Sequence, residues 1–261
     1  MRCFASTEAI EGGRVSLVVE RFGELGIIRL SRWIFNCYLI RGESSWTVVD
    51  AGMPGSADDV AGVLSVLGGS VGAVVATHGH SDHVAGAPRL ATEHAAPLYV
   101  PAVTVEYLDG SRQPRTPALS KVAQIWPTLL SQPLDLTGLR GFADGARIAG
   151  YGGRRGMIAD GLAAARPLAD GQLLPGLAGW QVLHVPGHTD DSTAFWHPDS
   201  ATLLSGDAVL SADGRAWFTP ETVDADAAAR SEARMRALPV EHLLPGHGLP
   251  VHGRDVWAAA R

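Results

Sequence analysis

Short apolar segments separated by turns rich in Gly and Pro recur along this chain, and this alternation limits the folds that it can adopt. β-Branched and aromatic residues dominate the segments, which favours strands. The predicted strands are Trp33–Ile40, Trp46–Val49, Val71–Ala76, Leu98–Val100, Trp180–Val185, Ser192–Trp196 and Ala201–Ser205. Helices are predicted over Ser56–Leu67 and Asp224–Leu238. Because each apolar face needs a second layer to cover it, the pattern predicts β-sheets covered by helices, in an α/β or α+β fold.

The chain length predicts a single domain over residues 1–261, because 261 residues are enough for one large core. Residues from about 101 to 170 interrupt the alternation with several Pro and Gly residues. They contain one helical segment, Ala118–Gln132, which is broken at Pro127. We interpret this region as an insertion that can serve as a lid.

Apolar residues make up 46% of the chain and charged residues 18%, which is typical of a globular protein without a membrane span. The formal net charge of -6 argues against a nucleic-acid partner, which would need a basic surface. Cys3 and Cys37 lack the spacing of a disulfide framework or a thiolate metal site. Residues 1–13 contain charged side chains and no apolar core of a secretory signal, so we expect a cytoplasmic location.

The segment Thr77-His78-Gly79-His80-Ser81-Asp82-His83 directly follows the predicted strand Val71–Ala76. Three imidazoles and a carboxylate therefore lie close together at a strand end, where functional side chains can converge. These groups are suitable ligands for zinc and related divalent ions. A single His is usually structural, but this spaced set of four predicts a metal site. For the other isolated histidines we expect structural or surface roles: His94, His184, His197, His242 and His252.

The segment resembles the HxHxDH signature of the metallo-β-lactamase superfamily, and the resemblance extends over most of the chain. Three further matching segments follow in the order that this family shows: Pro186-Gly187-His188-Thr189, Ser205-Gly206-Asp207 and Leu244-Pro245-Gly246-His247. The turn Asp50-Ala51-Gly52 resembles the family's Asp-x-Gly turn beneath the site, which implies that Asp50 supports the metal ligands from outside. The resemblance implies a four-layer αβ/βα sandwich, with two β-sheets flanked by helices and the metal site at one edge of the sheets.

The family's ligand pattern, transferred to this chain, implies two metal ions. One would be held by His78, His80 and His188, the other by Asp82, His83 and His247, with Asp207 as the bridge. All seven positions are filled, which favours two zinc ions. Iron and manganese stay open because these ligand types do not distinguish them from zinc.

This ligand set implies a binuclear hydrolase in which a metal-bound hydroxide attacks the carbonyl group of a small-molecule substrate. Asp82 would orient the hydroxide and then pass a proton to the leaving group. We expect a carboxylic ester, a lactone or a thioester, because the short Gly-rich ligand loops resemble the lactonase and glyoxalase II branches. Two departures are the short segment after His247, and the run Asp207-Ala208-Val209-Leu210, which lacks the Tyr that lactonases often carry there.

Three other functions stay open: a β-lactamase, a mononuclear iron persulfide dioxygenase and a metal-binding protein without catalysis. The absence of a signal sequence argues against the first, and the complete ligand set argues against the second. Seven ligands on two ions leave coordination positions for water and substrate, which argues against a closed structural site. A monomer and a homodimer are both compatible with the sequence.

The substrate pocket is less constrained by the sequence. Asp190 and Asp191 stand where many family members have Pro-Gly, and we interpret them as turn caps rather than as a site for a cationic substrate group. As a hypothesis, Ala118–Gln132 covers the metals and selects an apolar acyl chain. The aromatic candidates for the pocket walls are Tyr107, Trp126, Phe142, Tyr151, Trp217 and Phe218.

Overall fold

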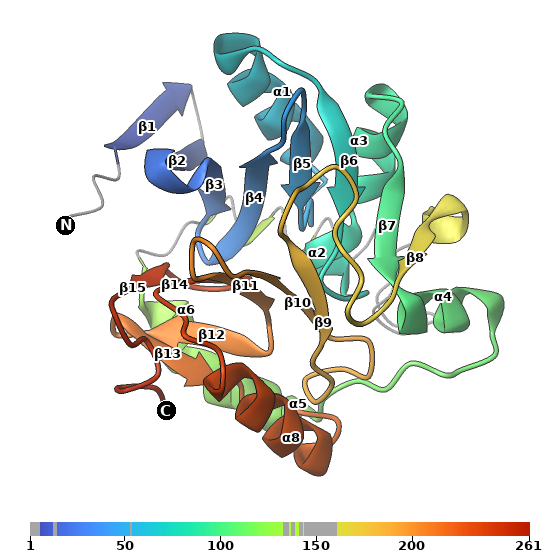
Figure 1. Ribbon diagram of the computed structural model, residues 1–261, viewed down its shortest axis with the longest axis vertical. Helices are drawn as coiled ribbons and strands as arrows, with labels where there is room; N and C mark the ends of the chain where they lie inside the picture. Colours follow the sequence, from blue (N-terminus) through green and yellow to red (C-terminus); the bar gives the residue numbers. More distant parts are fainter. Residues whose placement is uncertain are drawn as a thin grey trace.

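The computed structural model of the protein describes residues 6–12, 15–52, 54–132, 136, 139–140, 143 and 161–261. Within this part of the chain, the first sheet runs in the order β1-β2-β3-β4-β5-β6-β7-β8 (Figure 1). Its strands from β1 to β5 are antiparallel, and those from β5 to β8 pair in parallel. Their bounds are β1 Ser6–Gly12, β2 Val15–Phe22, β3 Ile27–Arg32, β4 Phe35–Arg41, β5 Trp46–Val49, β6 Val71–Val75, β7 Leu98–Pro101 and β8 Arg166–Leu168.

The second sheet runs in the order β15-β14-β11-β10-β9, and β12 and β13 form a separate hairpin. Strand β10 is antiparallel to both β9 and β11, and β11 is parallel to β14. Strands β9, β11 and β14 therefore end at the same edge of the sheet. The bounds are β9 Gln181–His184, β10 Thr193–His197, β11 Thr202–Gly206, β12 Val209–Ala212, β13 Arg215–Phe218, β14 His242–Pro245 and β15 Val251–His252.

The helices lie on the outer faces of the sheets, with α1 and α3 beside the first sheet and α8 at the far side of the second (Figure 1). Helix α8 begins after Asp224, whose Oδ1 accepts the Ala227 N–H at 2.9 Å and caps the helix. The bounds are η1 Gly23–Leu25, α1 Ser56–Leu67, α2 Ser81–Val84, α3 Ala87–Glu93, α4 Ala102–Asp109, α5 Leu119–Val122, η2 Ala123–Ile125, α6 Trp126–Leu130, η3 Leu162–Ala164 and α8 Ala225–Arg236.

Alternating side chains of each strand build the layers, because successive residues of a strand point to opposite faces. In β4, Leu39 belongs to the core beneath the helices, whereas Ile40 belongs to the core between the sheets. In β10, Phe195 faces the first sheet and Trp196 packs in the core that also contains Met235 of α8. The order is therefore helix, sheet, sheet, helix, and the predicted fold class is confirmed.

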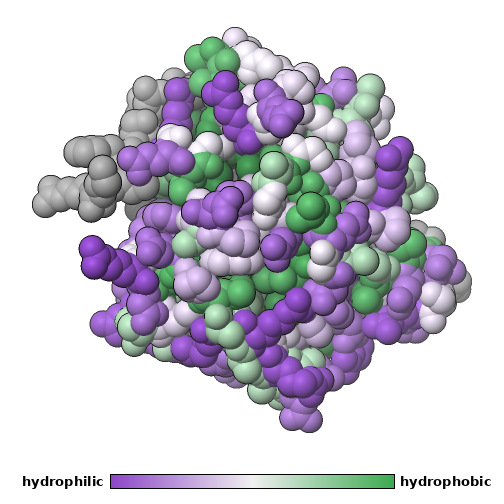
Figure 2. All heavy atoms as spheres, viewed as in Figure 1, coloured by the Kyte–Doolittle hydropathy of each residue, from purple (hydrophilic) through white to green (hydrophobic). Residues whose placement is uncertain are grey.

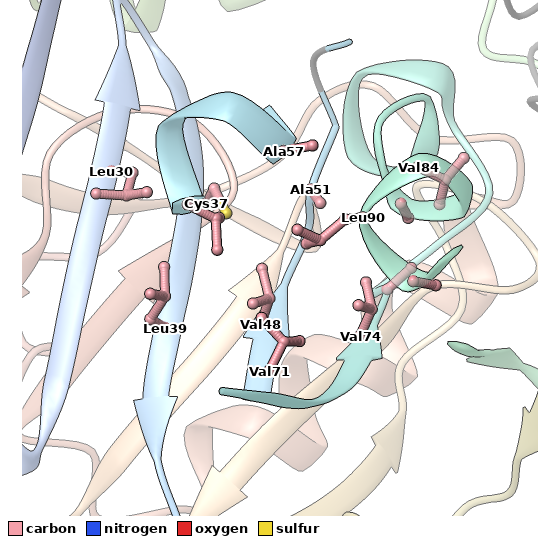
Figure 3. Packing of buried hydrophobic residues seen from close by; sticks show 14 of the residues in the cluster. Leu30, Cys37, Leu39, Val48, Ala51, Ala57, Val71, Val74, Val84 and Leu90 are labelled. Carbon is pink, nitrogen blue, oxygen red and sulfur yellow. The ribbon is translucent and has the colours of Figure 1, made fainter. Parts of the chain in front are cut away.

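The outer core of the first sheet shows how this layering is made. Side chains of its central strands, among them Leu39, Val48 and Val74, lie beneath Ala57 of α1 and Leu90 of α3 (Figure 3). All five are buried. The outside of the molecule in the view of Figure 2 carries hydrophilic residues interspersed with smaller hydrophobic areas. None of the helices in the described part of the chain combines the length and the apolar character that a bilayer crossing requires.

Several elements of the fold were not predicted, among them the first three strands and the hairpin β12–β13. The first predicted strand starts at Trp33, whereas β1, β2 and β3 precede it. The buried Leu17 and Val19, which alternate with less buried neighbours in β2, were the available signal. The hairpin β12–β13 was also missed. Its turn residues Asp213 (φ 52) and Gly214 (φ 70) both have positive φ, as an Asp-Gly hairpin turn requires.

Two paired strands of the first sheet lie at the two ends of the region from about 101 to 170. Strand β7 ends at Pro101, and β8 pairs with it in parallel. The predicted helical segment Ala118–Gln132 consists of α5, η2 and α6, and Pro127 lies in the first turn of α6, where its missing N–H removes no helical hydrogen bond. Thr128 of α6 donates its hydroxyl hydrogen to the carbonyl of Ser211 in β12 at 3.1 Å.

Candidate metal centre

The donor side chains after β6 lie in a short turn and a helix that directly follow this buried strand. Thr77, His78 and His80 are buried, and His80 has extended backbone immediately before α2. Asp82 and His83 lie in the single turn of α2. This change from strand to helix within a few residues lets neighbouring side chains point toward one centre.

Three loops of the second sheet supply the remaining donors. His188 follows β9, Asp207 directly follows β11, and His247 follows β14. Because these strands end at one edge of the sheet, the three side chains meet there. The backbone of Phe35 in the first sheet forms a bridge with His247, so the edges of the two sheets join at this point.

The donor atoms of these residues form overlapping groups in which all atoms lie within 4.8 Å of one another. The groups are His78, His80 and His188; Asp82, His83 and His247; and His78, His83 and Asp207. The first two groups contain the same residues as the two ligand sets that the resemblance implied, and their role as ligands stays a prediction. The third group connects them.

Asp207 connects the groups through a single oxygen. Its Oδ2 lies 3.0 Å from Nε2 of His247 and 3.4 Å from Nε2 of His83. The same oxygen lies 3.7 Å from Nε2 of His188 and 4.0 Å from Nε2 of His78. One carboxylate is thus within reach of the donors of both groups.

Further hydrogen bonds orient the donor side chains from the side that points away from the centre. Asp50, at φ 57 after β5, accepts the Thr77 N–H and hydroxyl, each at 2.8 Å, and its Oδ2 lies 3.0 Å from Nδ1 of His83. Nδ1 of His188 lies 2.7 Å from the carbonyl oxygen of Glu221, to which it can donate. Such contacts fix the ring nitrogen that faces the centre.

Burial lowers the pKa of three imidazoles, and the charge of neighbouring histidines lowers it further. His78, His80 and His188 are affected, and the pKa of His80 falls to about 3. These rings are therefore neutral near pH 7, as metal ligands must be.

The other two histidines behave differently. Burial would lower the pKa of His83 and His247, but the adjacent carboxylates, Asp207 foremost, raise it well above the usual value for His83 and to about 10 for His247. Burial likewise would raise the pKa of Asp82 and Asp207, but the two imidazoles lower it, to about 2 for Asp82. Without metal, protons on His83 and His247 thus balance the carboxylates. A divalent cation would supply the same compensation.

Unpaired polar atoms show that the centre suits a metal. Among the described residues, the buried atoms Nε2 of His78, Nε2 of His80, Oδ1 of Asp82 and Oδ1 of Asp207 have no hydrogen-bond partner. Buried polar atoms without partners are costly, and a cation surrounded by imidazole nitrogens and carboxylate oxygens would satisfy them. The donor set therefore fits a divalent metal.

The side chains of Asp190 and Asp191 bond to distant segments, in contrast to the turn caps that were expected from sequence. Asp191 is buried and accepts the Gly79 N–H at 2.8 Å and the Thr104 hydroxyl at 2.6 Å. Asp190 pairs with Arg115 in the segment that leads to α5. Their neighbours come from distant parts of the chain, which a local turn motif does not reveal.

The aromatic pocket candidates lie in different surroundings. Trp126 on α6 is 60% exposed, Tyr107 is buried and Trp217 is partly buried. Phe218 stacks on Trp257 at 5.4 Å, and it lines a cavity of about 320 Å³ against α8. Tyr151 and Phe142 lie outside the described residues.

The histidines outside the centre have other contacts. His184 reaches the carbonyl oxygen of Asp190 at 2.8 Å, His197 lies against Trp180, and Nδ1 of His242 lies 2.9 Å from Nδ1 of His252. The backbone of His94 forms the C-terminal cap of α3.

Sequence reasoning missed three residues that support or flank the centre. Asn36 and Tyr38 of β4 donate hydrogen bonds to the carbonyl of Pro245, each at 2.8 Å, just before His247. Glu221 is also buried near the centre, where burial and the charge of Asp207 raise its pKa to about 7. None of these three residues belongs to a local motif, so no pattern in the sequence indicated them.

Comparisons with known proteins identify the family of this chain. The sequence profile described as "Metallo-beta-lactamase superfamily" matches residues 32–247. The chain belongs to this superfamily and is a metal-dependent hydrolase.

Individual proteins and solved structures are also similar to this chain. "Probable metallo-hydrolase YflN" of Bacillus subtilis (strain 168) is 25% identical over 256 residues, which cover 88% of this chain and 86% of the relative. The solved structure of TTHA1623 in a di-iron-bound form is 27% identical with a TM-score of 0.55, and covers 86% of this chain and 92% of that one. The BLEG-1 B3 metallo-beta-lactamase shares the fold, at 20% identity and a TM-score of 0.53, over 84% of this chain and 88% of that one. The donor groups and the di-iron-bound neighbour support a divalent metal centre.

Proposed function

We propose that the protein is a binuclear hydrolase that cleaves a carboxylic ester, a lactone or a thioester of a small molecule. The position of Asp207 Oδ2, between the donors of both groups, carries this proposal. One ion would be held by His78, His80 and His188, the other by Asp82, His83 and His247, and Asp207 would bridge them.

Bound divalent ions would polarise the substrate carbonyl and lower the pKa of water to near 7, which supplies a nucleophile at neutral pH. The donor chemistry suits zinc, iron and manganese, and we favour zinc. The surrounding side chains set up the site for this chemistry. His78, His80 and His188 are neutral and offer lone pairs, and their burial excludes bulk water from that side.

Asp82 is the residue that we assign to proton transfer. Its Oδ2 lies 3.2 Å from Nε2 of His247, while its Oδ1 has no partner among the described residues. A carboxylate in that position can orient the attacking water, accept its proton and return the proton to the leaving group.

Hydrolysis of a substrate panel by the zinc-loaded protein tests the proposal. The panel contains aliphatic lactones, aryl esters, an acyl thioester and a chromogenic cephalosporin, with His78→Ala as the control. We expect turnover of one of the first three classes, and its loss in His78→Ala. Turnover of the cephalosporin alone would assign a β-lactamase instead. Inactivity toward the whole panel, together with oxygen consumption on a persulfide, would assign the dioxygenase.

A further inference from the structure

Asp191 connects the two loops that carry the three-histidine group. It lies three positions after His188, and its side chain is 1% exposed. Its Oδ2 accepts the backbone N–H of Gly79 at 2.8 Å and the hydroxyl of Thr104 at 2.6 Å. Gly79 lies between the other two histidines of the group. One carboxylate oxygen therefore links the loop of the third histidine to the peptide between the first two.

This contact is difficult to replace. The Gly79 N–H and the Thr104 hydroxyl both lie in the interior, where Thr104 on α4 is fully buried. Hydrogen bonds to an ionised carboxylate are stronger than neutral ones, and their loss leaves buried donors without a partner. The Thr193 N–H also donates to the carbonyl of Thr77 at 2.9 Å, so the two loops keep one backbone contact without Asp191.

The second donor group is held by a different set of contacts. Asp50 orients His83, as described above. The Asn36 N–H donates to the carbonyl of Gly246 at 3.1 Å and keeps the loop of His247 against β4. Among the described residues, the hydrogen-bond partners of the Asp191 side chain are Gly79 and Thr104, which are not part of these contacts.

We propose that Asp191 is a positioning residue that holds the three-histidine group in its metal-binding geometry. The inference rests on the binuclear centre of the proposed function. Loss of a comparable supporting contact typically weakens metal affinity about 10–100-fold. The effect should be confined to one of the two ions, because the group of Asp82, His83 and His247 keeps its own supports.

The test compares Asp191→Ala with the wild-type protein and with Asp190→Asn. The control removes a neighbouring negative charge that pairs with Arg115 and does not contact Gly79. Each protein is loaded with Zn²⁺ and dialysed against increasing chelator, and the zinc per chain is measured. We expect wild type and Asp190→Asn to hold both ions alike. In Asp191→Ala, one of the two ions should leave at about 10–100-fold lower chelator concentration.

Two milder variants keep the test decisive if Asp191→Ala does not fold by circular dichroism. Asp191→Asn removes the charge, and Thr104→Val removes one of the two donors. We expect both to release one ion earlier than wild type, and wild-type retention in both would overturn the positioning role. If the wild type holds two zinc ions and Asp191→Ala holds them equally well, only the role of Asp191 is wrong. A wild-type protein that binds no zinc would overturn the binuclear centre as well.

Discussion

Oδ2 of Asp50 lies 3.0 Å from Nδ1 of His83, so a buried carboxylate faces the imidazole side that points away from the centre. The same Asp50 stands at a positive φ of 57. Asn tolerates this backbone conformation better than most residues, so Asp50→Asn tests the charge with little backbone strain. We expect zinc affinity of the second group to fall about 10–100-fold, because His83 loses the anion that orients it.

Chelator titration and the melting temperature measure this effect together. A fall in affinity with an unchanged melting temperature of the metal-free protein would support the orienting role. Unchanged zinc retention in a folded variant would contradict it.

Gly52 leaves room for the turn that bears Asp82 and His83. A Cβ at this position would lie 1.5 Å from the carbonyl oxygen of Asp82 and 2.7 Å from the backbone nitrogen of His83. Because both contacts are with backbone, Gly52→Ala must displace the turn, and we expect a loss of stability of at least about 1–3 kcal/mol. Urea unfolding measures it. Gly62→Ala in α1 is the control, since a Cβ there meets nothing within 4 Å and should stabilise the helix by about 0.5–1 kcal/mol. Equal stability of the two variants would refute the packing argument.

Asp82→Asn separates metal binding from proton transfer. An amide cannot accept the proton from water, so we expect kcat to fall about 10²–10⁴-fold on the substrate identified by the panel. Zinc content is measured on the same sample. If the rate survives while both ions are retained, the proton-transfer role of Asp82 is wrong.

His242 and His252 should make the protein less stable in acid. Partial burial of its ring lowers the pKa of His252 to about 4, and the neighbouring His242 adds to this effect. Burial also lowers the pKa of His242, although Glu241 and Glu24 oppose it. Because the unfolded side chains titrate near 6.5, the unfolded state binds more protons between about pH 6.5 and about pH 4, and stability is lost as the pH falls through this window.

The buried centre also contributes to the pH dependence of stability. Comparing the free energy of unfolding of wild type and His252→Gln isolates the contribution of the histidine pair. Urea unfolding at about pH 5 and about pH 7.5 should show a smaller pH dependence in the variant. The same pH dependence in both proteins would exclude the histidine pair as a cause.

Trp126 tests the hypothesis that the segment Ala118–Gln132 selects the acyl chain. Its side chain is 60% exposed on α6 and is therefore accessible to a substrate. We expect Trp126→Ala to shift the chain-length preference toward shorter acyl groups, with zinc content unchanged. A series of esters of increasing chain length measures kcat/KM. An identical preference in the variant, or after deletion of the segment in a folded protein, would reject the hypothesis.

The donor residues could be found from sequence because each follows a strand and sits in a short motif. His78, His188, Asp207 and His247 all come within a few residues of a buried apolar run. The donor motifs, which extend from residue 78 to residue 247, also follow one another in the order that the metallo-β-lactamase superfamily shows. Their assignment as ligands remains a proposal that the zinc measurements test.

The supports of the centre could not be found in this way. Asp191 contacts Gly79 and Thr104, and Tyr38 contacts Pro245, across 87 to 207 residues of sequence. Such pairs depend on how two sheets meet, and local propensity carries no information about that. The early strands are a different case, because Leu17 and Val19 belong to a local alternation in β2 that is a signal of a strand.

The contact between the two sheets at the centre has a consequence for the lifetime of the protein. His78 extends from the end of β6 in one sheet and His247 from the end of β14 in the other, so bound ions would fasten the sheets together. A ligand that binds only the folded state adds about 2.7 kcal/mol of stability at 100 times its Kd. Proteases act on the unfolded fraction, which such binding makes smaller. We therefore expect the supply of metal in the cell to determine how long the chain survives as well as whether it is active.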